Sequence, residues 1–349
     1  MSLLFSSLAL VQQRILEWYE KAGRKELPWR NLRRDGSEAY GVYVSEIMLQ
    51  QTQVSRVLES FYFPFLERFP TLRALSEALE SEVLLSWQGL GYYSRARNMR
   101  KCAQICAREY GAQLPADVDA LKRLPGIGSY TAGAIACFGF GESVGFVDAN
   151  IRRVLARLFA LQNPSQKELE SLAHRLLNKN ASFEHNQALF DLGALICTPA
   201  PRCLICPLSE FCQGKSAPAR YPLKTAKQYE NLHLKLCIFY ARDSVRDSTQ
   251  DSRGICFALR KAESGLYAGL YNLPHLGDFS PAQQAKARYI GEFKHSYTKY
   301  KITASVYALE SSKDSKNPAN DSFTFAHLGD LLPISNLTKK ALKFANDIS

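Results

Sequence analysis

Four of the nine cysteines lie in one short stretch and have the spacing of a metal site. Cys197, Cys203, Cys206 and Cys212 follow the pattern C-x5-C-x2-C-x5-C, so one loop can bring four thiolates to a single centre. Both zinc and a 4Fe–4S cluster accept four cysteine ligands, and this spacing does not separate them. Two disulfides or four buried thiols are the alternative, which the lack of a secretory signal disfavours.

The other five cysteines stand singly among apolar residues. We expect these five to be reduced residues of the core: Cys102, Cys106, Cys137, Cys237 and Cys256.

A glycine-rich turn forms the second chemical feature. The segment LPGIGSYTAG at 124–133 places Gly126 and Gly128 just before a helical pattern. Glycines there let the backbone approach a ligand, and the free N–H groups of a helix start suit a phosphate. A G-x-G pattern alone is more often a plain turn.

The elements that must position these features change character along the chain. Residues 8–212 show helical periodicity throughout, and we expect one amphipathic helix after Gly41 that places Glu46 on a polar stripe and runs to Phe61. Residues 213–229 lose this periodicity and gather Pro, Ala, Ser and Lys, as linkers do.

The second half combines strand-like and helical patterns. We expect strands at 232–241, 255–259 and 301–309, helices at 281–289 and 337–346, and solvated loops at 243–253 and 311–322. The prediction is therefore an α+β multidomain protein, with an all-helical domain at 1–214, a linker at 215–229 and a mixed α/β domain at 230–349.

The charge balance favours a polyanionic partner. The chain carries 44 Lys and Arg against 33 Asp and Glu, a formal charge of +11. Nucleic acid is the first candidate, although a generically basic protein is an equal alternative on charge alone. No apolar run is long enough to span a bilayer, so we expect no membrane partner and a cytoplasmic location.

The glycine turn resembles the helix-hairpin-helix of the endonuclease III superfamily of base-excision glycosylases, which binds DNA phosphates without reading sequence. The cysteine loop is similar to that superfamily's iron–sulfur loop, although the first spacing is five residues here and six in the family. The resemblance implies one 4Fe–4S cluster in place of zinc.

Further segments are similar to the adenine DNA glycosylase (MutY) family. They are LPWR at 27–30, SEIMLQQTQV at 45–54, GLGYYSRARN at 89–98, VDANIRRVLARL at 147–158 and DLGALICT at 191–198. Endonuclease III carries a lysine nucleophile where this chain has Tyr130, and a phenol forms no Schiff base. We therefore expect adenine removal without strand cleavage, by a monomer acting on double-stranded DNA in a bacterial cell.

The resemblance also assigns chemical roles. Breaking an N-glycosidic bond calls for two carboxyl groups in different protonation states. Glu46 corresponds to the acid that protonates adenine N7, and Asp148 to the carboxylate that faces the sugar cation, with Tyr130 and Asn150 as donors. The alternatives are a solvated helix-face glutamate and a helix N-cap, respectively.

A base inside the duplex must be flipped out before these groups can reach it. By resemblance, Leu49, Gln51 and Tyr92 probe or fill the duplex, and Arg30 and Gln187 read the edge of adenine. Leu49 and Tyr92 could instead be core residues, and Gln187 a surface one.

The second half resembles a MutT-like (Nudix-fold) domain at GLYAGLYNLP, residues 265–274. Residues 281–292 lack the acidic box of Nudix hydrolases, so we expect a module that recognises 8-oxoguanine, with Thr52 also at the lesion. The family loop F-x-H-x-F-S-H corresponds here to 293–299, where Thr298 and Lys299 replace serine and histidine. The loop could equally be a plain β-hairpin.

Two other functions stay open at this point. One is an endonuclease III-like glycosylase and lyase for oxidised pyrimidines, which Tyr130 and the second domain oppose. The other is a non-catalytic iron–sulfur protein that only binds DNA.

Overall fold

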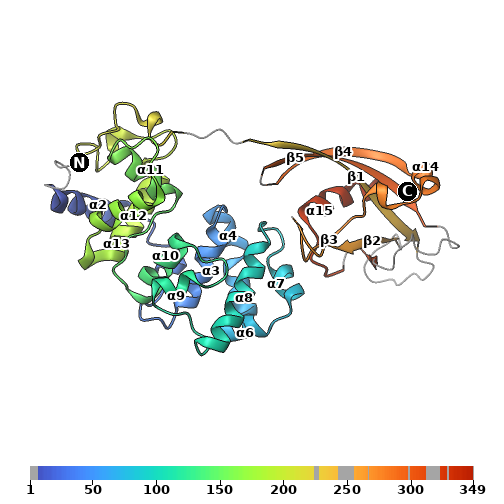
Figure 1. The fold of residues 1–349 in the computed structure, drawn as a ribbon, viewed down its shortest axis with the longest axis horizontal. Coiled ribbons are helices and arrows are strands. Elements are labelled where there is room, and N and C mark those ends of the chain that lie inside the picture. Colours follow the sequence, from blue (N-terminus) through green and yellow to red (C-terminus); the bar gives the residue numbers. More distant parts are fainter. Residues whose placement is uncertain are drawn as a thin grey trace. The chain divides into compact units, whose positions relative to one another are not determined.

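The computed structural model describes residues 7–223, 228–242, 255–265, 267–297, 299–311, 323–327 and 330–348. The chain divides into two compact units (Figure 1). The helical unit comprises 1–77 and 98–225, and the sheet unit comprises 78–97 and 226–349. We describe each unit by itself.

The described part of the helical unit contains no strand, which confirms the all-helical prediction. Its helices are α2 (Leu8–Ala22), α3 (Ala39–Leu49), α4 (Val54–Ser60), α5 (Tyr62–Arg68), α6 (Leu72–Glu77), α8 (Ser94–Glu109, which begins in the sheet unit), α9 (Val118–Lys122), α10 (Ser129–Phe140), α11 (Ala149–Leu158), α12 (Gln166–Leu176) and α13 (Ser182–Asp191). Short 3-10 turns η1 (Pro28–Arg30), η2 (Lys179–Ala181), η4 (Cys203–Ile205) and η5 (Pro218–Arg220) and one π-helical turn, η3 (Leu192–Ile196), complete it.

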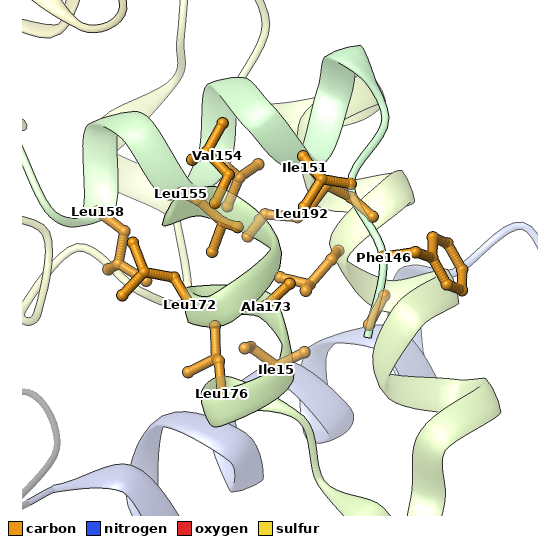
Figure 2. Packing of buried hydrophobic residues seen from close by; sticks show 14 of the residues in the cluster. Ile15, Phe146, Ile151, Val154, Leu155, Leu158, Leu172, Ala173, Leu176 and Leu192 are labelled. Carbon is orange, nitrogen blue, oxygen red and sulfur yellow. The ribbon is translucent and has the colours of Figure 1, made fainter. Parts of the chain in front are cut away.

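The apolar faces of α2, α11, α12 and α13 meet in one core (Figure 2). On α11, Ile151, Val154, Leu155 and Leu158 repeat at helical spacing and are all buried. They face Leu172, Ala173 and Leu176 of α12 and Ile15 of α2. This core holds the N-terminus of α11, and with it Asp148, in place.

The helix expected after Gly41 is two helices. The helix is interrupted at 50–53, where Gln51 has φ 58°. Residues 42–48 of the first helix are all buried. The helix α3 packs closely on α10, because a Cβ on Gly139 would lie 2.9 Å from the Cβ of Ala39. The amphipathic prediction was wrong for this reason: α3 is enclosed, and Glu46 lies in the interior.

The sheet unit is a mixed sheet with helices. Its strands are β1 (Glu230–Arg242), β2 (Ile255–Lys261), β3 (Tyr271–Asn272), β4 (Arg288–Tyr297), β5 (Tyr300–Glu310) and β6 (Thr324–Ala326). The order is β3-β2-β1-β5-β4, with β6 on β2; β1 and β5 are parallel and the other pairs antiparallel. Helices α7 (Glu80–Ser86), α14 (Pro281–Lys286) and α15 (Asn336–Leu342) and 3-10 turns η6 (Leu276–Asp278) and η7 (Lys343–Asp347) complete it.

Both faces of this sheet carry buried apolar residues. One face packs Ile238, Val306 and Leu259 against α15, and the other packs Phe239 and Phe279. The helix expected at 281–289 ends early, because the strand β4 already begins at Arg288. The β4–β5 hairpin joins Tyr297 to Tyr300, so the hairpin alternative for the 293–299 loop describes its backbone correctly.

The unit boundary at 225/226 lies inside the predicted linker. Residues 215–223, however, belong to the helical unit, where Leu223 N donates to Gln162 O at 2.9 Å. Residues 78–97 group with the sheet, which the sequence did not indicate: Gln88 reaches the carbonyls of Leu332 and Ile334, and Arg97 donates to Ala268 O. Among the described residues, no helix is long and apolar enough to cross a membrane.

Candidate active site

Glu46 lies in the last turns of α3 with only 6% of its surface exposed. The Tyr130 hydroxyl, from the first turn of α10, donates to Glu46 Oε2. Burial raises the pKa of Glu46 to about 7, and the charge of Asp148 adds to this effect, while the Tyr130 hydrogen bond and Arg30 oppose it. A carboxyl with this pKa can hold a proton near neutral pH and give it up.

Asp148 is the N-cap of α11, and its Oδ1 accepts a hydrogen bond from Ile151 N at 2.7 Å. The N-cap alternative is therefore correct, and it does not compete with a chemical role, because the cap uses only part of the carboxylate. Burial raises the pKa of Asp148, whereas donors from Ile151 and Asn150 and the charge of Arg153 lower it. The two carboxyls interact, because the charge of Asp148 raises the pKa of Glu46.

Asn150 connects this region to the cysteine loop. Its Oδ1 accepts from Arg153 Nη2 at 2.8 Å, and the same Nη2 donates to Gly193 O at 2.7 Å. Arg153 Nε donates to Cys197 O at 2.6 Å. One arginine thus links the residue beside Asp148 to the first cysteine.

Arg30, the residue expected to read the edge of adenine, is bound by a buried aspartate. Its Nη1 and Nη2 donate to the two carboxylate oxygens of Asp191 at 2.7 and 2.8 Å. Asp191 is fully buried and also binds Arg24, at 2.6 Å. Both ends of the Arg30 fork are therefore engaged by the protein, and Asp191 is a residue of the site region that the sequence reasoning missed.

The hairpin at 124–128 joins α9 to α10. Gly126 has φ 81°, and a Cβ there would lie 2.9 Å from the Cβ of Asn98, so this position needs glycine. Gly128 is the N-cap of α10 with φ −87°, and a Cβ on it would meet open space. The exposed start of α10 follows, with the free N–H groups that suit an anion.

Comparison with known proteins identifies the family to which the chain is similar. Residues 44–179 match the HhH-GPD superfamily base excision DNA repair protein. An adenine DNA glycosylase of Mycolicibacterium smegmatis is 46% identical over 207 residues, which are 58% of this chain and 69% of the relative. The chain belongs to the adenine DNA glycosylase family.

Other relatives agree with this assignment. The human adenine DNA glycosylase is 31% identical over 362 residues, 84% of this chain and 66% of the human one. Among solved structures, a thermostable thymine-DNA glycosylase superposes with a TM-score of 0.56 at 28% identity, over 60% of this chain and 97% of that one. A non-covalent endonuclease III–DNA complex gives 0.53 at 21% identity, over 62% and 98%, which shows the shared fold.

The residues expected to handle the flipped base occupy different environments. Gln187 is buried at 4% exposure on α13, one turn before Asp191 and on the same face, so the surface alternative is excluded. Leu49 is partly buried at the end of α3, and Gln51 is exposed in the break that follows, beside Thr52, whose hydroxyl donates to Gln50 O. This break offers a protruding element on the active-site helix.

Tyr92 lies in the sheet unit, in the left-handed region at φ 47°. Its ring contacts that of Tyr297, with centroids 5.9 Å apart, and Tyr297 in turn contacts Tyr267 at 5.3 Å. A pocket beside these rings is also lined by His295 and Tyr93. Tyr92 is therefore part of an aromatic cluster with the hairpin strand β4.

The four cysteines line one small cavity together with Arg157. Arg157 is buried, and its Nη1 donates to Thr198 O at 2.6 Å and to Cys197 Sγ at 3.4 Å. Burial raises the pKa of the Cys206 thiol to about 11. Within the described ranges, no three His, Cys, Asp or Glu side chains are grouped closely enough to hold a single metal ion.

At the tip of the β4–β5 hairpin, Lys299 Nζ lies 2.5 Å from Glu230 Oε1, and both side chains are exposed. Glu230 N also donates to Lys299 O at 2.8 Å. Thr298 lies outside the described residues. The position that departs from the family loop is thus paired with the first residue of β1.

Proposed function

We propose that this glycosylase hydrolyses the N-glycosidic bond of adenine mispaired with 8-oxoguanine or guanine, and that it leaves the strand intact. The observation that carries the proposal is the buried Glu46, bonded to Tyr130, with a pKa raised to about 7 and Asp148 as its charged neighbour. Family membership supports adenine as the base.

In the proposed reaction, Glu46 donates its proton to adenine N7, which makes the base a better leaving group. The electron pair of the C1′–N9 bond leaves with the base, and the sugar becomes an oxocarbenium-like cation. Asp148 stabilises this cation as a carboxylate. At the same time it caps α11, because its Oδ1 accepts a hydrogen bond from Ile151 N. The oxygen of water then bonds to C1′, and the proton that water loses returns to the carboxylate of Glu46, which restores the acid.

Tyr130 supports this chemistry in two ways. Its hydroxyl fixes the orientation of the Glu46 carboxyl, and its position has no amine that could attack C1′. The lyase alternative needs such a nucleophile, so we infer a monofunctional enzyme. A glycosylase of this kind acts on one duplex site and needs no second copy, so we also propose a monomer.

Cys197, Cys203, Cys206 and Cys212 would hold one 4Fe–4S cluster. The donor set fits a cluster in place of a single ion: four thiols line one cavity, although no three of them group around one point. The buried guanidinium of Arg157 offsets the charge of thiolate ligands. When bound, the cluster would fix the loop as a structural staple. The reaction steps above use only side chains of the chain itself.

The sheet unit would act as the Nudix-like module that recognises the base opposite adenine. Support comes from its mixed sheet and from the aromatic cluster at Tyr92, Tyr297 and Tyr267, since aromatic rings stack on exposed bases. Because Lys299 is engaged by Glu230, we expect weaker discrimination between 8-oxoguanine and guanine than a histidine would give.

The decisive experiment incubates the purified chain with duplexes that contain one 8-oxoguanine:adenine or guanine:adenine pair. Free adenine is measured directly, and strand breaks are measured with and without alkali. Adenine release with breaks only after alkali is the expected result. Breaks without alkali would favour the lyase, and no release would leave a DNA-binding protein. Iron content and visible absorbance test the cluster, and a colourless protein with one zinc would exclude it.

A further inference from the structure

Asp191 is a buried carboxylate with many hydrogen bonds, yet nothing in the proposed reaction uses it. It is 0% exposed and accepts five hydrogen bonds, two from the Arg30 fork and three from the backbone N, Nε and Nη2 of Arg24, at 2.6–2.8 Å. Burial raises the pKa of Asp191, but the bonds and charge of Arg30 and Arg24 outweigh this effect and keep it below its usual range.

The position of Asp191 connects it to the adenine site. It ends α13, one turn after the buried Gln187 and on the same face. Its partner Arg30 is the last residue of η1, and η1 packs on α3. The charge of Arg30 acts on Glu46, which lies in α3. Asp191 therefore holds a cation whose charge acts on the proposed acid.

Arg30 is not fully satisfied by the protein. Its side chain is 5% exposed, and its Nε has no hydrogen-bond partner among the described residues. A buried, unpaired N–H is costly and points to a ligand that completes it. The guanidinium is thus fixed on one side and left with a free donor.

We propose that Asp191 is a positioning residue for adenine excision: it fixes the Arg30 guanidinium beside Glu46 and offsets its charge, so that Glu46 can keep its proton. This inference rests on the proposed function of Glu46 as the acid. Tyr130 donates a hydrogen bond to Glu46, and the charges of Asp148 and Arg30 act on it. Arg30 in turn faces Asp191 and the hydroxyl of Tyr19, near Glu184.

The direction of the effect follows from charge. If Asp191 becomes neutral, the uncompensated cation of Arg30 favours the ionised form of Glu46 and lowers its pKa. Because the acid must be protonated, activity is lost as pH rises through that pKa. The alkaline limb of the pH–rate profile should then move to lower pH.

The test compares Asp191→Asn with the wild type on an 8-oxoguanine:adenine duplex, in single turnover. We expect adenine release at pH 7.5 to fall at least about tenfold, the dissociation constant to change by less than about threefold, and the alkaline limb to move down by about one pH unit. Arg24→Gln is the matched control, because it removes the other partner of Asp191. The alkaline limb of its pH–rate profile should stay at the wild-type pH or move to higher pH.

A second variant covers the case in which Asp191→Asn fails to fold by circular dichroism. Arg30→Lys keeps the charge but loses the planar fork. Its rate of adenine release should therefore fall, while the alkaline limb of its pH–rate profile does not move to lower pH. A wild-type rate and profile in Asp191→Asn would overturn the proposal, as would an equal downward shift of the alkaline limb in Arg24→Gln. If Asp191→Asn does not fold, a wild-type rate in Arg30→Lys would overturn it. If the wild type itself releases no adenine, the proposed function fails instead.

Discussion

The two units differ in where they place charged side chains. The helical unit encloses the carboxyls of Glu46 and Asp191, while the described ion pairs of the sheet unit lie at its surface, as Lys299–Glu230 and Arg242–Glu310 do. Burying a charge is costly, whereas an exposed pair contributes little in either direction. The difference teaches that the helical unit gives up stability at Glu46, whose pKa is raised by burial, to hold this carboxyl in a reactive state.

The strongest way to break this comparison is to remove the buried acid. Glu46→Gln keeps the size and the polar character of the side chain but cannot donate its proton to adenine. We expect adenine release to fall about a thousandfold, which corresponds to ~4 kcal/mol, while duplex binding persists. Single-turnover release and binding anisotropy measure the two effects. Near-normal release would show that Glu46 is a structural residue like the surface carboxylates.

The helix cap allows the two roles of Asp148 to be separated. Both Asp148→Asn and Asp148→Ala remove the charge and should abolish most adenine release. Only alanine also removes the acceptor for Ile151 N, so it should lower the free energy of unfolding by about 1 kcal/mol more than asparagine does. Denaturant titration checks this difference. Equal losses of stability in the two variants would contradict the capping role.

The cost of the buried acid should itself be measurable. The pKa of Glu46 is raised from 4.5 to about 7, so the folded state loses stability as pH rises through this range. The side chain of Glu46→Gln cannot ionise. The free energy of unfolding of this variant should therefore rise relative to the wild type by about 3 kcal/mol at pH 8 and by almost nothing below pH 4.5. Unfolding curves at both pH values test the sign, and a difference independent of pH would be evidence against it.

The smallest effect belongs to the sheet unit. Glu230→Gln breaks an exposed pair, so the melting temperature should stay within about 2 °C of the wild type. The same variant frees Lys299 for DNA phosphate, and binding should become tighter at low salt for every duplex. Lys299→His is the matched variant, expected to raise the preference for 8-oxoguanine over guanine. A large loss of stability in Glu230→Gln would make the comparison between the units invalid.

Much of the helical unit was accessible from the sequence, because its periodicity and its glycine turn are local signals. The environment of Glu46 was not accessible from local signals. Its helix reads as amphipathic only if it continues to Phe61, and the break at 50–53 comes from the positive φ of Gln51, which no residue type there announces. The proposal that Glu46 is the acid came from family resemblance alone.

Asp191 shows a second limit. Its partners Arg24 and Arg30 lie more than 150 residues away, and such pairing depends on how η1 packs in the tertiary fold. Likewise, the parallel pairing of β1 with β5 joins residues 70 positions apart, so a strand pattern predicts the two strands but not their register. Sequence spacing identifies candidate ligands within one loop, such as the four cysteines, and misses partners that only folding brings together.

The grouping of residues 78–97 with the sheet has a topological consequence. The chain passes between the two units three times, at 77/78, 97/98 and 225/226. A protease that cuts only at the last crossing would separate the backbone into two fragments. The C-terminal fragment would nevertheless keep its contacts with 78–97, which remain on the N-terminal fragment, through Gln88 and Arg97. Nicked protein should therefore stay together as a complex of two chains.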